Sequence, residues 1–107
     1  MDKKMLTQKL NEISWQEHVN FEISEKYPDD REQSLRDAEE IEAMLRDLAS
    51  QISPNTLDML EQTDGIEWSL RLSPYVVEDD SVARAKKYLH HERYEIRFWA
   101  KRLLKNS

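Results

Sequence analysis

The stretch from Glu78 to Lys105 constrains the fold most, because its apolar residues recur at helical spacing in two successive runs. The first run is Val82, Ala85, Tyr88 and Leu89, and the second is Ile96, Trp99, Ala100, Leu103 and Leu104. Each run is apolar on one side and charged on the other, so neither helix can bury its apolar face alone. The stretch therefore predicts two helices that dock against each other and against the elements that precede them.

Part of this stretch resembles the second half of a HEAT-type helical repeat. The resemblance depends on Leu89, Ile96-Arg97, Ala100 and Leu103. HEAT repeats show a leucine, an Asp-Pro turn, then Val-Arg, and an alanine and a leucine on the next helix. Here His91 and Glu92 stand in the turn, so Glu92 or Glu95 would replace the usual acidic partner of the arginine. The match covers about a quarter of the chain and implies stacked helical hairpins.

The length and composition favour one helical domain over residues 1–107. One glycine and three prolines are too few for the many turns of an all-β chain. No apolar run is long enough to span a membrane, and Met1-Asp2-Lys3-Lys4 does not read as a signal peptide. The absence of cysteine excludes disulfides and thiolate metal sites. We therefore expect a cytoplasmic protein.

The amino-terminal region predicts two helices that a cap separates. Met5, Leu6, Leu10 and Ile13 form a short apolar stripe. Ser14-Trp15-Gln16-Glu17 matches a capping box, which predicts that a second helix starts at Trp15. That helix would turn Trp15, Val19, Ile23 and, at its end, Tyr27 inward. One continuous helix is the alternative, because nothing between the two forbids it, and Pro28 ends the region in either case.

The clearest helical pattern runs from about Asp30 to Gln51. Its apolar stripe is Leu35, Ala38, Ile41, Met44, Leu45, Leu48 and Ile52. Ser53-Pro54 then predicts the start of another helix, with serine as the N-cap and proline at the first helical position. Asp64-Gly65 predicts its end.

Residues 66–77 are compatible with two structures. Ile66, Trp68, Leu70 and Leu72 alternate with polar residues as in a strand. A lone strand would lack a partner, so we favour a short helix that ends before Pro74. The whole chain is then all-α, with short stacked hairpins as in a HEAT-like superhelix, or else an irregular helical bundle.

The sequence does not indicate an enzyme, a cofactor or a metal site. No serine lies in a glycine-flanked elbow, and a single glycine cannot form a phosphate-binding loop. His91 and Glu95 have the spacing of metal ligands, but no third ligand completes the set, so a solvated turn is the favoured interpretation. We therefore expect no catalytic residues.

Nucleic-acid binding is an alternative function that rests on the last two helices. Their cations are Arg84, Lys86, Lys87, Arg93, Arg97, Lys101, Arg102 and Lys105, interleaved with Tyr88, Tyr94, Phe98 and Trp99. The net charge of −6 has the wrong sign for a phosphate backbone, and Tyr88 and Trp99 fall on the inner faces of their helices. Nucleic acid is therefore a disfavoured partner.

Binding of a basic protein fits the sequence best. The expected contacts are two acidic patches and two aromatic anchors. The first patch is Asp29, Asp30, Glu39, Glu40, Glu42 and Asp47, and the second is Asp79 and Asp80. The anchors are Trp68 and Tyr75. In general character the chain is similar to the cytosolic immunity proteins of bacterial contact-dependent growth inhibition systems. That resemblance implies one-to-one neutralisation of a cognate toxin, often a basic RNase or DNase. A protein–protein adaptor remains a further alternative.

Overall fold

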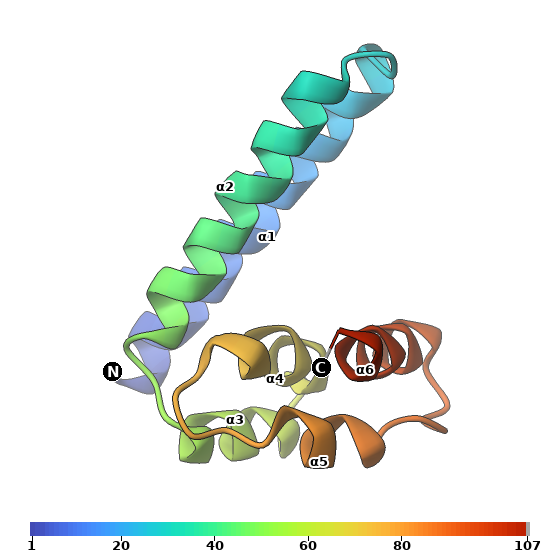
Figure 1. The fold of residues 1–107 in the computed structure, drawn as a ribbon. Helices are drawn as coiled ribbons and strands as arrows, with labels where there is room; N and C mark the ends of the chain where they lie inside the picture. Colours follow the sequence, from blue (N-terminus) through green and yellow to red (C-terminus); the bar gives the residue numbers. More distant parts are fainter. Residues whose placement is uncertain (107) are drawn as a thin grey trace. The chain divides into compact units, whose positions relative to one another are not determined.

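The computed structural model describes residues 1–106, and every regular element in this range is helical. The elements are α1 (Lys3–Lys26), α2 (Arg31–Ala49), α3 (Pro54–Glu61), α4 (Ile66–Leu72), the 3₁₀ turn η1 (Ser73–Tyr75), α5 (Ser81–Lys86) and α6 (Tyr94–Lys105) (Figure 1). The all-α prediction is confirmed. Contacts within the chain group it into one unit of residues 1–48 and a second unit that begins at residue 49.

Helix α1 is continuous from Lys3 to Lys26, so the predicted break at Ser14 is wrong and the alternative of one helix is right. The helix is capped by Asp2, whose Oδ1 accepts a hydrogen bond from the backbone N–H of Met5 at 2.8 Å. A capping serine needs an extended backbone, which would interrupt the helical hydrogen bonds around it. No proline or glycine near Ser14 favours that interruption, and the helix continues to the turn at Pro28.

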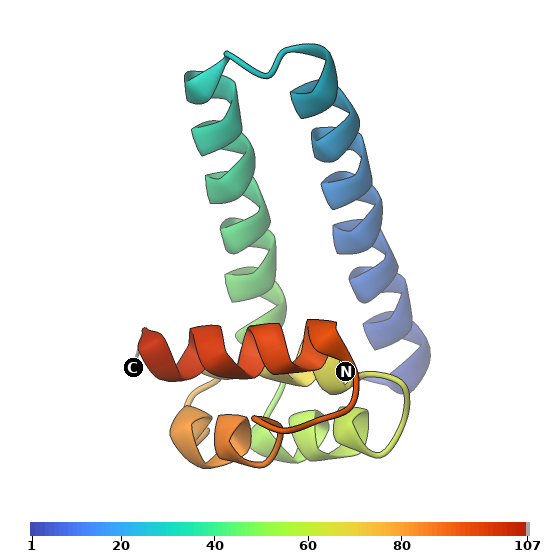
Figure 2. The same cartoon turned by 90° about the vertical axis from the view of Figure 1, so that its right-hand side faces the viewer.

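Helices α1 and α2 run side by side and form a hairpin (Figure 2). Asp30 starts α2, since its Oδ1 accepts from the backbone N–H of Gln33 at 2.9 Å. The buried residues of the two helices are Leu6, Leu10 and Ile13 on α1, and Leu45, Leu48 and Ala49 on α2. All of them lie in the half of the hairpin that is remote from the connecting loop.

The most exposed large apolar residues of the hairpin are Trp15 (66%), Phe21 (62%), Tyr27 (63%) and Leu35 (65%). The inward orientation predicted for Trp15, Tyr27 and Leu35 is therefore wrong, and Ile23 is also exposed. An apolar stripe is buried only where another element covers it. In the half of the hairpin next to the loop, residues 15–26 and 31–40 include no buried side chain, so the two helices cover little of each other there.

The start of α3 agrees with the prediction from Ser53-Pro54. Ser53 is the N-cap, Pro54 occupies the first turn, and Thr56 Oγ1 accepts from the backbone N–H of Ser53 at 3.4 Å. The chain turns into α4 at Gly65, where a Cβ atom would lie 3.0 Å from Leu60 Cδ2 and 3.1 Å from the Leu60 carbonyl oxygen. A side chain at this position would require Leu60 to shift by a few tenths of an ångström, so glycine suits this close approach.

Within residues 66–77 the chain forms the favoured short helix over Ile66–Leu72, and the strand alternative is wrong. Helix α4 ends at Leu72, and Pro74 lies in the 3₁₀ turn that follows. Leu70 and Leu72 are both buried, and so are the polar residues Ser69 and Arg71 that alternate with them. The second half of α4 is thus covered on all sides, so the alternation of apolar and polar residues does not correspond to an alternation of burial.

The second unit has its core where α4, α5 and α6 meet. The core residues are Leu70, Ala85, Ile96, Ala100 and Leu103. Arg97 closes the turn before α6, because its Nη1 donates to the carbonyl oxygens of His91 (2.7 Å) and Glu92 (2.9 Å). The arginine thus binds backbone oxygens of the turn. Within the described part of the chain, no helix has the length and apolarity needed to cross a membrane.

Candidate protein-binding surface

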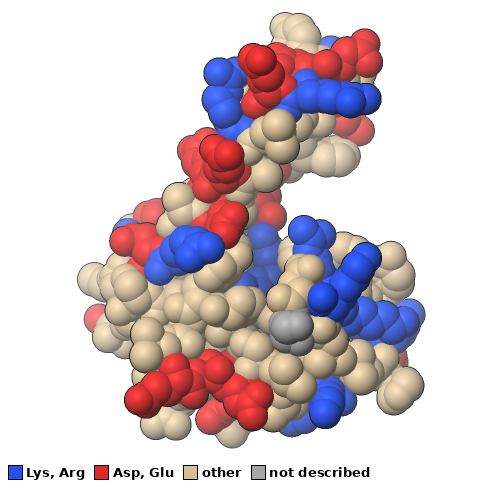
Figure 3. Space-filling view, viewed as in Figure 1, with Lys and Arg blue, Asp and Glu red and all other residues tan. Residues whose placement is uncertain are grey.

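The first predicted acidic patch lies on α2 and on the loop before it. Asp29 and Asp30 are in the loop, while Glu39, Glu40, Glu42 and Asp47 are on the helix. Asp30 caps α2, and Glu42 Oε1 accepts from Arg46 Nη2 at 2.7 Å. Figure 3 shows that acidic side chains are interspersed with basic ones near the hairpin loop. The patch is therefore a mixed surface with an excess of acid.

The acids of α2 face two directions, because 3.6 residues per turn separate neighbouring positions by about 100°. Glu39 and Glu42 share a side with the exposed Leu35. Glu40 and Asp47 share another side, away from Leu35. A partner that contacts Leu35 would therefore meet Glu39 and Glu42 in the same contact.

The hairpin also carries exposed aromatic residues, and they do not share one side of α1, because the six residues from Trp15 to Phe21 turn the helix face by about 120°. Trp15 stacks at an angle on His18, with ring centroids 5.8 Å apart, and His18 Nε2 lies 3.2 Å from Glu22 Oε1. Phe21 is exposed further along the helix, and Tyr27 is exposed at its C-cap. Exposed aromatic side chains are the residue type that anchors protein partners, so these positions are candidate contacts. Helical periodicity does not reveal these anchors, because it assigns most of them to the core.

A hollow of about 270 Å³ lies beside the hairpin loop. It is lined by Ile23, Ser24, Tyr27, Asp30, Gln33, Ser34 and Asp37. Gln33 Nε2 donates to Asp37 Oδ1 at 2.8 Å and so orients that carboxylate. The lining combines an aromatic ring with two carboxylates, which suits a side chain that is apolar along its stem and positively charged at its end.

The second predicted patch is not an exposed acidic surface. The Asp79 carboxylate is buried and bound to Arg84, and this prediction is wrong for Asp79. Asp80 is exposed, but its Oδ1 accepts from the backbone N–H of Ala83 at 3.0 Å and caps α5. Both residues are engaged within the second unit. Glu78 precedes them with a φ of 68°, in the left-handed region of backbone conformation.

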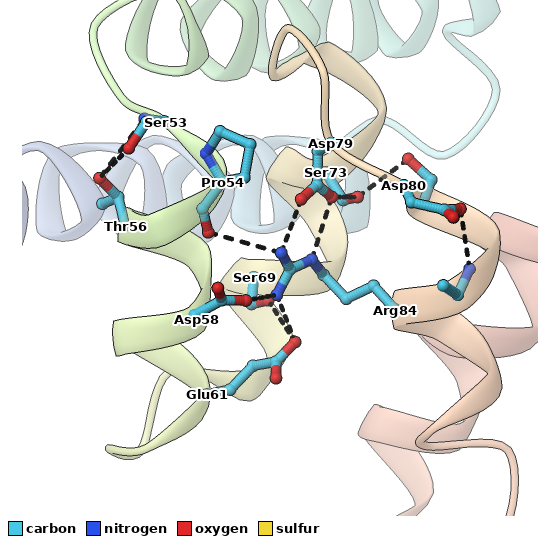
Figure 4. A network of polar contacts seen from close by, with 12 residues as sticks. Ser53, Pro54, Thr56, Asp58, Glu61, Ser69, Ser73, Asp79, Asp80 and Arg84 are labelled. Atoms are coloured by element: carbon cyan, nitrogen blue, oxygen red, sulfur yellow. Dashed lines mark hydrogen bonds and ion pairs between the residues drawn. The ribbon is translucent and has the colours of Figure 1, made fainter.

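Arg84 is the centre of a buried ionic network (Figure 4). Its Nη1 lies 2.5 Å from Glu61 Oε1 and 2.9 Å from Asp58 Oδ1. Its Nη2 also reaches the Pro54 carbonyl oxygen at 3.5 Å. The Ser73 hydroxyl donates to the Asp79 carboxylate, which therefore binds both a cation and a hydroxyl. The network joins α3, the 3₁₀ turn and α5.

The pKa values of the carboxylates in this network are lowered. Burial alone would raise the pKa of Asp79, but hydrogen bonds from Arg84 and Ser73 outweigh it. Burial is likewise the largest single influence on the pKa of Glu61, and Lys87 and Arg84 together reverse it. Asp79 also contributes most to the raised pKa of Arg84. All these groups stay charged near neutral pH, as a structural ion cluster requires.

Trp68 and Tyr75, the predicted aromatic anchors, are both half-buried. The Arg71 guanidinium carbon lies 4.7 Å from the ring centroid of Trp68 and 4.7 Å from that of Trp99. Arg71 is thus placed between a tryptophan of α4 and one of α6. Trp68 therefore contributes to the packing between these helices.

The basic residues of α5 and α6 divide into engaged and exposed groups. Arg84 and Arg97 are held internally, and Lys87 Nζ binds Glu61 Oε2 at 2.7 Å. The exposed members on α6 are Lys101, Arg102 and Lys105, which with Tyr94 and Phe98 line a shallow hollow. Figure 3 shows basic side chains gathered over α6. Among residues 1–106, no cluster of three or more histidines or carboxylates is arranged to hold a metal ion.

Comparison with known proteins assigns the chain to no family. No protein-family model matches the chain, and no significant match was found among curated proteins or among solved structures.

Proposed function

We propose that this protein is an inhibitor of the immunity-protein kind, which binds a basic toxin domain through the α1–α2 hairpin. The observation that carries the proposal is the exposure of Trp15, Phe21, Tyr27 and Leu35 on one acidic helical hairpin. Exposed aromatic and aliphatic anchors supply binding free energy when a partner covers them. Carboxylates around them speed association with a positively charged partner and select against an acidic one.

The charge distribution supports the choice of a basic partner. Residues 1–48 contain 13 acids and 7 bases, whereas the remaining residues contain 9 of each. The acidic excess therefore belongs to the unit that presents the anchors. A nuclease cleft is basic because it binds phosphates, so an acidic hairpin can occupy it in place of nucleic acid.

A growth assay with the product of the gene adjacent to this one tests the proposal. That product should arrest growth when it is expressed alone, and co-expression of this protein should relieve the arrest. Trp15→Ala should weaken the purified complex by at least about 2 kcal/mol, the threshold for an interface hot spot. Calorimetry at low and high salt should also show weaker binding as salt increases.

Val77→Ala is the matched control, since Val77 is an exposed apolar residue of the second unit. It should leave binding and rescue unchanged. Equal loss of affinity in the two variants would show that the hairpin is not the binding site. A neighbouring gene product that neither arrests growth nor binds would contradict the inhibitor function, and stable association with a non-toxic protein instead would favour an adaptor.

A further inference from the structure

Helix α6 presents an outer face that is apolar at its start and basic at its end. Tyr94 and Phe98 are both exposed, with ring centroids 6.3 Å apart. Arg102 and Lys105 follow on the same side, and the ion pairs of residues 1–106 include none to either of them. Arg102 instead lies over the Trp99 ring at 5.6 Å. This face has apolar area and positive charge available for a partner.

Helix α2 presents a face with the opposite charge and the same order of residue types. Leu35 is exposed, and Glu39 and Glu42 follow it on the same side of the helix. The helix as a whole contains six acids and three arginines, a net charge of −3. Helix α6 contains four cations and one acid, a net charge of +3.

The spacing on the two faces is identical. Leu35, Glu39 and Glu42 stand at positions i, i+4 and i+7 of α2, and Phe98, Arg102 and Lys105 stand at i, i+4 and i+7 of α6. Residues at this spacing form one stripe along a helix. If two such helices lie parallel and in register, the apolar residues meet at one end and every acid meets a cation.

We propose that the protein self-associates through these faces, with α6 of one copy packed parallel to α2 of a second copy. Leu35 of one copy lies against Phe98 of the other, Glu39 faces Arg102, and Glu42 faces Lys105. This inference does not depend on the proposed inhibitor function. It does imply that a basic partner and a second copy of the chain would compete for the same surface of α2.

The size of the contact favours a two-fold dimer. Stable protein interfaces bury at least about 1,000 Å² in total, more than one pair of short helices supplies. In a reciprocal dimer each copy contributes one acidic and one basic face, so the contact occurs twice. A second copy also explains the match better than a nucleic acid does, because a phosphate backbone provides no counterpart for the apolar order shared by Leu35 and Phe98.

Analytical ultracentrifugation of the full chain over micromolar to millimolar concentrations tests the proposal. The dimer should appear at high concentration and weaken as salt is added. Glu39→Lys should weaken the dimer at least about tenfold, because it places two like charges together. Glu40→Lys is the matched control: it makes the same charge change at an adjacent exposed position on another side of α2, and should leave the dissociation constant within about twofold.

Exchange of the two charges between α2 and α6 provides a second test of the proposed dimer. Arg102→Glu alone should weaken the dimer, and the double variant Glu39→Lys with Arg102→Glu should restore most of the wild-type affinity. Phe98→Ala should weaken the dimer without a change of charge. Circular dichroism establishes that each variant is folded.

Four results would overturn the inference. These are a monomer at every concentration, equal effects of the Glu39 and Glu40 substitutions, failure of the double variant to recover, and no effect of Phe98→Ala. A fluorescent single-stranded oligonucleotide is the competing probe. Binding of that oligonucleotide that is lost with Arg102→Glu, in a protein that stays monomeric, would assign α6 to nucleic acid instead.

Discussion

Arg84 and Asp79 form a two-point ion pair, in which Nε donates to Oδ2 at 3.0 Å and Nη2 donates to Oδ1 at 2.6 Å. The two side chains are 7% and 2% exposed. Arg84 also binds Glu61, so a single guanidinium links α5 to α3 and to the loop before α5. Removal of one partner from a buried ion pair leaves the other charge buried without compensation, which strongly destabilises the fold.

Arg84→Met should therefore destabilise the second unit by about 3–5 kcal/mol, because it leaves buried carboxylates without a cation. Chemical denaturation monitored by circular dichroism measures the change. Arg93→Met is the control, because the Arg93 side chain is 56% exposed and lies 3.9 Å from Glu95. It should alter the free energy of unfolding by less than about 1 kcal/mol. Similar values for the two variants would mean that the network does not stabilise the fold.

The lowered pKa values of Asp79 and Glu61 predict sensitivity to acid. Although burial raises both pKa values, the bound cations hold them below the ordinary 3.8 and 4.5. The folded state binds these protons more weakly than the unfolded state, so the stabilisation is complete above the ordinary values and is lost as the pH falls through the lower folded ones. The melting temperature should be constant from neutral pH to about pH 5 and then fall. Asp79→Asn should flatten that fall; an unchanged slope would contradict the assignment.

Tyr88 should ionise at a higher pH than an ordinary tyrosine side chain. Burial, with a hydrogen bond to the Glu61 carboxylate, raises its pKa from 10.0 to about 12. The folded state therefore retains this proton more tightly, and its contribution to stability is present below pH 10 and lost as the pH rises toward 12. Absorbance of tyrosinate during alkaline titration measures the late step. Tyr88→Phe should remove that step, and a wild-type titration with no component near pH 12 would refute the prediction.

Leu35 and Leu48 should respond differently to the same substitution, although both belong to the apolar stripe of α2. Leu48→Ala should reduce the free energy of unfolding by about 2–5 kcal/mol, because Leu48 is fully buried. Leu35→Ala should change it by less than about 0.5 kcal/mol, because the side chain is exposed. Thermal melts of the two variants test the hairpin directly. Equal destabilisation would show that Leu35 is covered in solution.

Local signals in the sequence predict the short helices well. The Ser53-Pro54 start depends on neighbouring residues only, and proline at the first turn acts in any tertiary context. The Ser14 capping box is equally good as a local pattern, yet Ser14 lies inside a continuous helix. A cap forms only if the chain gains more from an interruption than from continued helical hydrogen bonds, and the four residues of the motif do not determine that balance.

The candidate surface was harder to predict, because exposure depends on which elements meet. Helical spacing places Leu35 on the same stripe as Leu48, but only tertiary packing decides which of them is covered. Arg84 is the opposite case, a charged residue that tertiary packing buries. Its charge suggested a phosphate contact, whereas three carboxylates from Asp58, Glu61 and Asp79 converge on it. That convergence involves residues up to 26 positions apart, and no sequence motif encodes it.

The uneven burial along the hairpin has a consequence for its local unfolding. The end that carries Leu10 and Leu48 is packed, whereas the loop end around Pro28 contributes exposed residues and little buried area. Opening free energies follow buried contact, so amide hydrogen exchange should become steadily faster from the packed end toward the loop. The same loop offers Lys26 and Arg31 to trypsin. A ligand that clamps the open end would slow both processes, and mass spectrometry of the exchanged peptides would locate the protected segment whatever the chemistry of that ligand.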